Sequence, residues 1–406
     1  HQTAEDRIPA LLTRLKQHTQ EAYAECQQIY LKQKIDRLIL KNIGIVIACT
    51  VAGCVAIWQL NKLYAPMLFD DGLIERVAEV HTQDQNFGVF DLNINIRDLR
   101  NATIAKMKQA PDAIVMGASH WQEAHVNLVT NKNFYNSHVH RDYYEDMLAV
   151  AQMYVQHNRL PKEVIIAIRD KLFTPVEDRT DFLWYPGIKY YRKLARKLGL
   201  EPHSQFETLE VQTWRELLSL PLLWENISRE FMAKELPHAT DKNKFDGLDV
   251  LLPGGSIIWS REHQATFTRA RARKEALAFA EASKYDPPKI DPIGVESIDR
   301  LLNFLQSEGV KIVLAHPPFN PEFYDEVAGT PYMIGLEKIK ELTKTYARKY
   351  NLPIIGSFDP REVGCDAKMY IDAEHSNATC LGKLLNQYNN LSTTKQQSNS
   401  VARLGG

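Results

Sequence analysis

The stretch PDAIVMGASH, residues 111–120, indicates the fold class more clearly than any other part of the chain. It holds four consecutive apolar residues, Ala113–Met116, followed by Gly117, Ala118 and then Ser119. A short apolar run bounded by turn residues is typical of a strand that is buried on both faces of a sheet. We therefore expect a buried strand that ends just before Ser119.

Three later stretches have the same character: EVIIAIRD (163–170), GVKIVLAHPP (309–318) and NLPIIGSFDP (351–360). They predict strands over Val164–Ile168, over Lys311–Ala315 and near Ile354 and Ile355. Helical patterns separate the strands, at Tyr143–Gln156, Glu296–Ser307 and Gly335–Lys349. Apolar strands that alternate with helices indicate a parallel sheet covered on both faces, so we expect a three-layer α/β/α domain.

The patterns divide the chain into five parts. We predict an amphipathic helical segment (1–41), a transmembrane helix (42–62), a partly helical lead-in (63–110), an α/β domain (111–388) and a polar tail that extends beyond the fold (389–406). Within the α/β domain, residues 177–290 form an insertion that is rich in Trp, Tyr and Arg. We expect this insertion to be mostly helical, with a turn at Pro253–Gly255.

The composition excludes several classes of protein. The chain has 49 basic and 50 acidic residues, so its net charge of −1 gives no global argument for nucleic-acid binding. A mean hydropathy of −0.34 excludes a polytopic membrane protein but leaves room for one span. No Walker A motif and no Rossmann glycine pattern is present.

The run IGIVIACTVAGCVAIWQL, residues 43–60, has no charged residue. Its 18 residues are about the minimum for crossing a hydrocarbon core, although a buried core helix is the alternative. Four basic residues lie just before the run: Lys32, Lys34, Arg37 and Lys41. Lys62 is the only base close behind it, so the positive-inside rule predicts a cytoplasmic N-terminus and an external α/β domain.

Apolar residues in the first segment follow a helical 3-4 spacing, interrupted by one threonine: Leu12, Leu15, Thr19, Ala22, Cys26 and Ile29. Two interpretations stay open for this helix. It is either a solvated amphipathic helix or a docking helix for a membrane partner.

Two sequence features suggest nucleophilic catalysis. Ser119 follows a buried strand, where open α/β sheets place their active sites, although a serine there can also be a helix N-cap. In YIDAEHSNATCLGKLL, residues 370–385, Asp372 and His375 lie three residues apart at the start of a late helix. The carboxylate can orient the imidazole that takes the serine proton, or it can simply cap the helix beside a surface histidine.

Together, the Gly117-Ala118-Ser119 turn and the Asp372-x-x-His375 motif resemble the SGNH/GDSL hydrolase superfamily. The resemblance covers about residues 110–176 and 290–388. It looks closest to the membrane-anchored branch that includes alginate and cellulose O-acetylation proteins and the teichoic-acid D-alanylation transfer protein. The stretches VFDLNINIRDLR, PPFNPEFYD and IIGSFDP are similar to that branch as well. The resemblance implies an SGNH-like fold with Ser119, His375 and Asp372 as catalytic residues.

The other sequence blocks of the superfamily match less well. The usual Asp of the first block is Ala118 here. The second block, which supplies an oxyanion N–H, corresponds to FYNSH with Asn136 and Ser137. Arg169 replaces the usual Asn of the third block, where it either stabilises an oxyanion or simply pairs with Asp170. We expect the backbone N–H of Ser119 to be one oxyanion donor.

Three weaker patterns complete the set. His138, His140 and Asp142, with His120, are a poor zinc signature, so we expect no metal. Two basic runs either contact an anionic polymer or lipid or are solvated helix surface: Arg269, Arg271, Arg273 and Lys274, and Arg192, Lys193, Arg196 and Lys197.

Cys365 and Cys380 are the only cysteines outside the predicted cytoplasmic and membrane segments, and they bracket the Asp372-x-x-His375 motif. An oxidising compartment permits a disulfide between them. Two free thiols are the alternative, since Cys380 fits a helix core position.

The resemblance implies O-acyl transfer, most simply O-acetylation, to a bacterial envelope or secreted polysaccharide. The protein would be a single-pass protein of the bacterial inner membrane with a periplasmic or extracellular domain. In the resembling systems a multipass membrane-bound O-acyltransferase supplies the acyl group, and no bound cofactor is needed. A carbohydrate esterase and a non-catalytic scaffold subunit are the alternatives.

Overall fold

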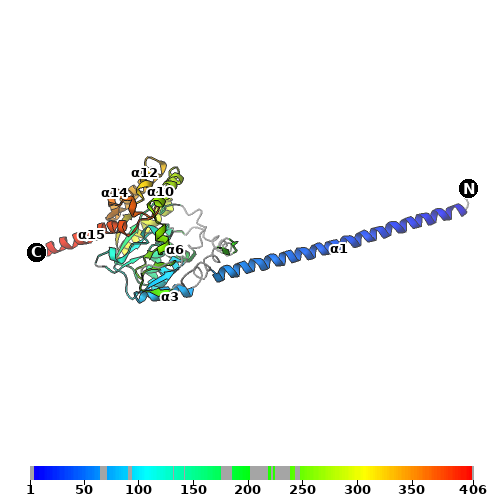
Figure 1. Cartoon of the computed structure of the whole chain (residues 1–406), viewed down its shortest axis with the longest axis horizontal. Helices are drawn as coiled ribbons and strands as arrows, with labels where there is room; N and C mark the ends of the chain where they lie inside the picture. The colour runs from blue at the N-terminus through cyan, green and yellow to red at the C-terminus, as the bar shows by residue number, and fades with distance from the viewer. Residues whose placement is uncertain are drawn as a thin grey trace. The chain divides into compact units, whose positions relative to one another are not determined.

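The structure, a computed structural model, describes residues 4–64, 71–89, 94–130, 132–140, 142–174, 185–201, 218–220, 223–224, 238–242 and 247–404. The chain divides into two compact units. One comprises residues 1–64 and 217–224, and the other comprises residues 65–216 and 225–406. Figure 1 shows the course of the chain.

The first unit is built on one continuous helix, α1 (Ala4–Tyr64), of 61 residues. The predicted segments 1–41 and 42–62 are therefore parts of the same helix. No proline interrupts the sequence between Ala10 and Tyr64, and Pro66 follows the helix end. The helix contains a stretch that is long and apolar enough to cross a membrane, within Thr19–Asn61, and this stretch is not buried inside the protein.

The second unit contains a five-stranded parallel sheet in the order β3-β2-β4-β8-β9. Its strands are β2 (Ala113–Met116), β3 (Phe134–Asn136), β4 (Glu163–Ala167), β8 (Lys311–His316) and β9 (Ile354–Gly356). The four predicted strands are confirmed, with small shifts of their ends. The strand β3 was not predicted, because Phe134–Asn136 ends in a polar residue and is not part of a longer apolar run.

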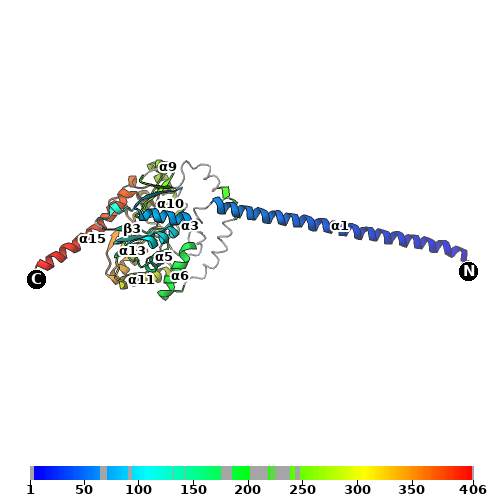
Figure 2. The ribbon, with the colours of Figure 1, turned by 90° about the horizontal axis from the view of Figure 1, so that it is seen from below.

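Alternate residues of the strands face two separate apolar cores. Helices cover one face of the sheet: α4 (Ile96–Lys106), α5 (Tyr144–Gln156), α6 (Tyr185–Lys197), α11 (Pro292–Ser307) and α13 (Pro331–Tyr350). Two elements cover the other face: α14 (Pro360–Val363) and α15 (Ala378–Leu404). The expected α/β/α layering is therefore present, and Figure 2 shows α5, α11 and α13 in the same part of the view.

A second, antiparallel sheet has the order β5-β1-β6-β7 and was not predicted. Its strands are β1 (Asn86–Val89), β5 (His238–Thr240), β6 (Asp249–Leu251) and β7 (Ile257–Ile258). The strand β1 comes from the expected lead-in and the other three from the expected helical insertion. The lead-in is therefore part of the α/β unit, and the insertion is not helical throughout.

The remaining helices are α3 (Asp71–Thr82), α9 (Arg261–Thr266), α10 (Arg269–Ser283) and α12 (Pro321–Glu326). The predicted turn at Pro253–Gly255 joins β6 to β7. The polar tail from residue 389 continues α15 as far as Leu404, and Figure 1 shows this helix leaving the sheet.

Candidate active site

The strand order has a topological switch point between β2 and β4. The strand β3, which follows β2 in the chain, pairs with one edge of β2, and the next strand of this sheet, β4, pairs with the other edge. Ligands of open α/β sheets bind where the order reverses in this way. Ser119 follows β2 and Arg169 follows β4, so both residues lie at this edge.

A tight turn positions Ser119 at the end of β2. The turn leads into a short 3-10 helix, η1 (Ser119–Trp121). A Cβ atom at Gly117 would lie 2.6 Å from Ala167 Cβ and 2.9 Å from Trp121 Cδ1, which is too close for any side chain. The turn therefore requires glycine at position 117 to bring β2, β4 and η1 together.

Asp372 and His375 lie in a compact loop, which is closed by an isolated β-bridge between Tyr370 and Ser376. Oδ1 of Asp372 accepts hydrogen bonds from the N–H groups of Glu374 and His375, both at 2.8 Å. Asn320 holds the loop from outside, because its Nδ2 donates to the Asp372 carbonyl at 2.9 Å. Asp372 is therefore not a helix cap; Asn377 accepts from Thr379 N–H instead, at the start of α15.

The structure brings the three predicted catalytic residues together. His375 Nε2 lies 2.7 Å from Ser119 Oγ, and His375 Nδ1 lies 2.7 Å from Asp372 Oδ2. The side chains of His375 and Asp372 remain 24% and 31% exposed, so a substrate can reach them. This is the hydrogen-bonded order of nucleophile, base and orienting acid.

The surroundings set the protonation of the pair. Burial alone would lower the pKa of His375, but the hydrogen bond and charge of Asp372, with the charge of Glu374, raise this pKa overall. Burial opposes the charged form of Asp372 as well, yet the hydrogen bonds and charge of His375 lower the pKa of this carboxyl. The loop thus favours an ionised Asp372 beside an imidazole that accepts a proton readily.

A buried charge cluster lies behind His375. Arg169 donates to Asp170 at 3.0 Å and to Glu374 at 3.2 Å, and its guanidinium lies 3.7 Å from Asp142. Burial opposes the charge of Arg169, but these carboxylates raise the pKa of its guanidinium overall. The cluster fixes Glu374, whose peptide unit leads directly into His375.

His120 is a second histidine at the site that the sequence interpretation considered only as a metal ligand. Its ring lies 5.3 Å from that of His375, centre to centre, and its Nε2 lies 3.7 Å from Glu374 Oε1. Burial, with the nearby charge of Arg169, lowers the pKa of His120 to about 4. His120 is therefore neutral at physiological pH and does not compete with His375 for a proton.

The residues expected at the oxyanion use their backbone N–H groups inside the fold: Asn136 N–H donates to the Gly254 carbonyl at 2.7 Å, and Ser137 N–H donates to the Val115 carbonyl at 2.9 Å. Asn136 is fully buried, and its Nδ2 donates to the carbonyl of Trp121 at 2.6 Å. Ser137 is equally buried and shares a 2.6 Å hydrogen bond with the Tyr154 hydroxyl. Both side chains are therefore hydrogen-bonded inside the fold as well. Arg169 follows its second interpretation, since it pairs with Asp170.

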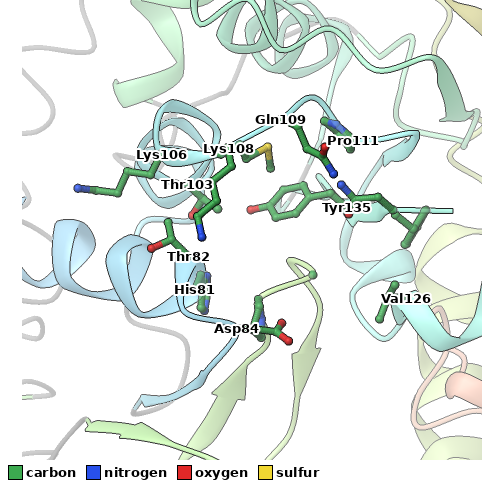
Figure 3. Close-up of a pocket in the computed structure, with 15 residues that line it drawn as sticks. His81, Thr82, Asp84, Thr103, Lys106, Lys108, Gln109, Pro111, Val126 and Tyr135 are labelled. Carbon is green, nitrogen blue, oxygen red and sulfur yellow. The ribbon is translucent and has the colours of Figure 1, made fainter.

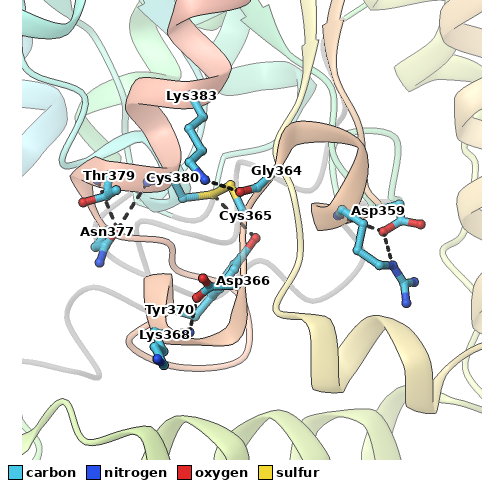
Figure 4. The surroundings of a disulfide bond; sticks show 11 residues. Asp359, Gly364, Cys365, Asp366, Lys368, Tyr370, Asn377, Thr379, Cys380 and Lys383 are labelled. Carbon is cyan, nitrogen blue, oxygen red and sulfur yellow. Dashed lines mark hydrogen bonds and ion pairs between the residues drawn. A yellow bond between two sulfur atoms is a disulfide. The ribbon is translucent and has the colours of Figure 1, made fainter.

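The predicted disulfide between Cys365 and Cys380 is present (Figure 4). It joins the end of α14 to the first turn of α15. It lies in the apolar core on the face of the sheet that these two helices cover. The loop with Asp372 and His375 lies between the two cysteines in sequence. The cross-link therefore restrains both ends of that loop.

The metal and charge patterns have simple structural roles. No group of three or more His, Cys, Asp or Glu residues is placed to hold a metal among the described residues. His138 Nδ1 lies within hydrogen-bond distance of Arg100 and Asn136. On the basic helix surfaces, Arg271 pairs with Glu275 and Lys197 with Glu308.

A separate pocket of about 490 Å³ lies near α3 and α4 (Figure 3). It is lined by His81, Thr103 and Tyr135, and by Pro111, which precedes β2. Two of its lining residues, Pro111 and Asn133, come just before β2 and β3, at the amino ends of these strands, whereas Ser119 lies beyond the carboxyl end of β2. The pocket is therefore not part of the candidate active site.

Comparison with known proteins adds no family assignment. No family model matches the chain, and no curated protein matches it. Function must be argued from the site itself.

Proposed function

We propose that the protein transfers an acyl group, most simply acetyl, to a hydroxyl group of a bacterial envelope or secreted polysaccharide. The single observation that carries this proposal is the hydrogen-bonded chain of Ser119, His375 and Asp372 at the carboxyl edge of the sheet. The resemblance of the Gly117-Ala118-Ser119 and Asp372-x-x-His375 motifs to membrane-anchored SGNH proteins supports the choice of substrate class.

The first half of the reaction forms an acyl-enzyme. Ser119 Oγ attacks the carbonyl carbon of the acyl donor, and its proton moves to His375 Nε2. Asp372 holds the imidazole by Nδ1 and stabilises the imidazolium that results. The tetrahedral intermediate then expels the donor's leaving group, which takes the proton from His375.

The second half regenerates the serine. A polysaccharide hydroxyl gives its proton to His375 Nε2 and attacks the acyl carbon. The bond to Ser119 Oγ breaks, and the proton returns from His375 to the serine. Water in place of the polysaccharide would make the same groups an esterase, so access of the acceptor decides between transfer and hydrolysis.

The negative charge on the carbonyl oxygen needs donors at both stages. The backbone N–H of Ser119 begins η1 and takes part in no hydrogen bond with the described residues. It is the donor that we assign to the oxyanion hole. Neither Asn136 nor Ser137 fills this role, because their backbone N–H groups donate to the carbonyls of Gly254 and Val115.

The proposal includes a membrane arrangement. The apolar part of α1 anchors the chain in the inner membrane, with the basic residues before it in the cytoplasm and the α/β unit outside. A single helix cannot move an acyl group across a bilayer. A multipass membrane-bound O-acyltransferase therefore delivers the acyl group to Ser119.

The test compares Ser119→Ala with wild type at matched protein levels. We expect the variant to lose acylation of the polysaccharide and hydrolysis of an activated acetyl ester. Ser307→Ala, at the exposed end of α11, is the matched control and should keep both. Wild-type modification by Ser119→Ala would reject catalysis and favour a non-catalytic scaffold subunit.

A further inference from the structure

Residues 217–224 read LLSLPLLW, an apolar segment inside the insertion of the α/β unit. Eight residues are far too few to cross a hydrocarbon core. An apolar run of this length with a terminal tryptophan is suited instead to the boundary between the bilayer and water. The residues on either side of it, Glu216 and Glu225, are charged.

The structure places this segment against the end of α1. Asn61 Nδ2 donates to the Ser219 carbonyl at 3.0 Å, across 158 residues of sequence. The same carbonyl also accepts a hydrogen bond from Leu223 N–H at 3.1 Å. The segment belongs to the same compact unit as α1 and not to the α/β unit.

The contact lies at the level where the apolar run of α1 ends. The 18 residues from Ile43 to Leu60 measure about 27 Å along a helix, close to the thickness of a hydrocarbon core. Preceding residues such as Val51 and Val55 are exposed, whereas Trp58 is half-buried and Asn61 is fully buried. The buried amide of Asn61 is satisfied by Ser219, as a polar group at a membrane boundary requires.

The outer side of the segment has no protein cover among the described residues. Leu218, Leu220 and Trp224 are 43%, 61% and 74% exposed. If α1 lies in a bilayer, these side chains are at the depth of the lipid headgroups and upper acyl chains. Lipid then covers an apolar surface that would otherwise face water.

We infer that residues 217–224 are a second membrane contact, which inserts into the lipid interface beside the outer end of α1. The inference rests on the membrane anchoring in the proposed function but not on acyl transfer. The partner is the bilayer itself. It follows that the insertion returns the chain to the membrane after the α/β unit has begun.

The experiment uses the full chain in nanodiscs of phosphatidylcholine, with and without brominated acyl chains. Cys26, Cys49 and Cys54 are replaced by serine, the Cys365–Cys380 disulfide is kept oxidised, and Leu220→Cys carries an environment-sensitive nitrobenzoxadiazole label. Retained Cys54, labelled in the unchanged Leu220 background, is the membrane control. Glu281→Cys on α10, where the glutamate is 68% exposed, is the aqueous control.

We expect brominated lipid to quench the labels at positions 220 and 54 several-fold more than the label at 281. Trp224→Cys should give the same result as Leu220→Cys, which guards against a local effect of one substitution. The inference would be overturned if the label at position 54 is quenched while the labels at 220 and 224 are quenched no more than the label at 281. In that case α1 would still be a membrane anchor. Absence of quenching at position 54 would reject the anchor and the inference together.

Discussion

His375 Nε2 lies 2.7 Å from Ser119 Oγ, although 256 residues separate the two along the chain. The two residues are positioned by different parts of the fold. Ser119 is held by the turn after β2, and His375 by a loop that Asn320 and the Cys365–Cys380 disulfide restrain. The two side chains meet beyond the carboxyl end of β2, and the proposed chemistry follows from this arrangement.

The turn before Ser119 is sensitive to the smallest added side chain. Gly117→Ala would place a methyl group against Ala167 and Trp121, and overpacking of this kind costs about 1–3 kcal/mol. We expect a lower free energy of unfolding and a lower kcat, because Ser119 shifts with the turn. Gly382→Ala, whose methyl would lie 3.4 Å from Leu128, is the control and should lower neither quantity, because alanine is favoured over glycine inside a helix. Unaltered stability and kcat in Gly117→Ala would contradict the tight turn.

Glu374 should control the pH dependence of the reaction. The base must be neutral to accept the serine proton, so kcat/KM falls as pH drops below the pKa of His375. Glu374 helps to raise this pKa and Arg169 lowers it. We expect Glu374→Gln to move the acidic limb of the kcat/KM profile to lower pH, measured with a soluble activated ester. The control Glu281→Gln lies on the exposed face of α10, and an unmoved limb in Glu374→Gln would argue against the cluster's role.

The disulfide should contribute to stability as well as to the site. Its cysteines are 15 residues apart, and closing a loop of that size stabilises a fold by about 3 kcal/mol in the chain-entropy model. We expect Cys365→Ala with Cys380→Ala to lower the free energy of unfolding by about this amount. The acyl-transfer rate should fall too, since the loop with Asp372 loses a restraint. Cys26→Ser should match wild type, and equal stability of the double variant would count against the structural role.

Orientation in the membrane is open to a direct test. With the native exposed cysteines replaced by serine, Glu281→Cys should react with a membrane-impermeant maleimide in intact cells whose outer membrane has been permeabilised. Thr19→Cys, on the part of α1 that precedes the apolar run, should react only after lysis of the inner membrane. The reverse pattern would invert the proposed topology.

Much of the fold could be predicted from local patterns. Buried strands such as Ala113–Met116 are short apolar runs, and helices such as α13 have a regular apolar spacing. The second sheet could not be predicted, because β1 pairs with β5 and β6 across more than a hundred residues. Strands such as Asn86–Val89 and His238–Thr240 also lack the continuous apolar run that marks Ala113–Met116.

In the candidate site, too, local patterns predicted some residues, whereas the roles of others depend on partners distant in sequence. The sequence identified Ser119, Asp372 and His375, because turn residues and a three-residue spacing mark them. It placed Asn136 and Ser137 near the oxyanion, but their hydrogen bonds inside the core depend on distant partners such as Tyr154. Glu374 adjoins His375 in sequence, and yet its role depends on Arg169, which comes from another strand. Adjacency to the Asp-x-x-His motif was the only signal that could have identified it.

Asp372 should affect catalysis through the imidazole of His375, to which its Oδ2 is hydrogen-bonded. Asp372→Asn keeps the shape of the loop but removes the charge that raises the pKa of His375. By analogy with other triads, we expect a loss in kcat on the order of 10⁴-fold, with the unfolding free energy much less affected. Kinetics with the activated ester, alongside thermal unfolding, separate the two effects. A variant with nearly wild-type kcat would remove Asp372 from the mechanism.

The central claim is that Ser119 is the nucleophile, and covalent labelling measures this most directly. The full-length chain is treated with a fluorophosphonate, and the modified residue is located by peptide mass spectrometry. The account predicts one adduct at Ser119, absent in Ser119→Ala and strongly slowed in His375→Ala, with Ser307→Ala labelled like wild type. An adduct at another residue, or equal labelling of wild type and Ser119→Ala, would contradict it.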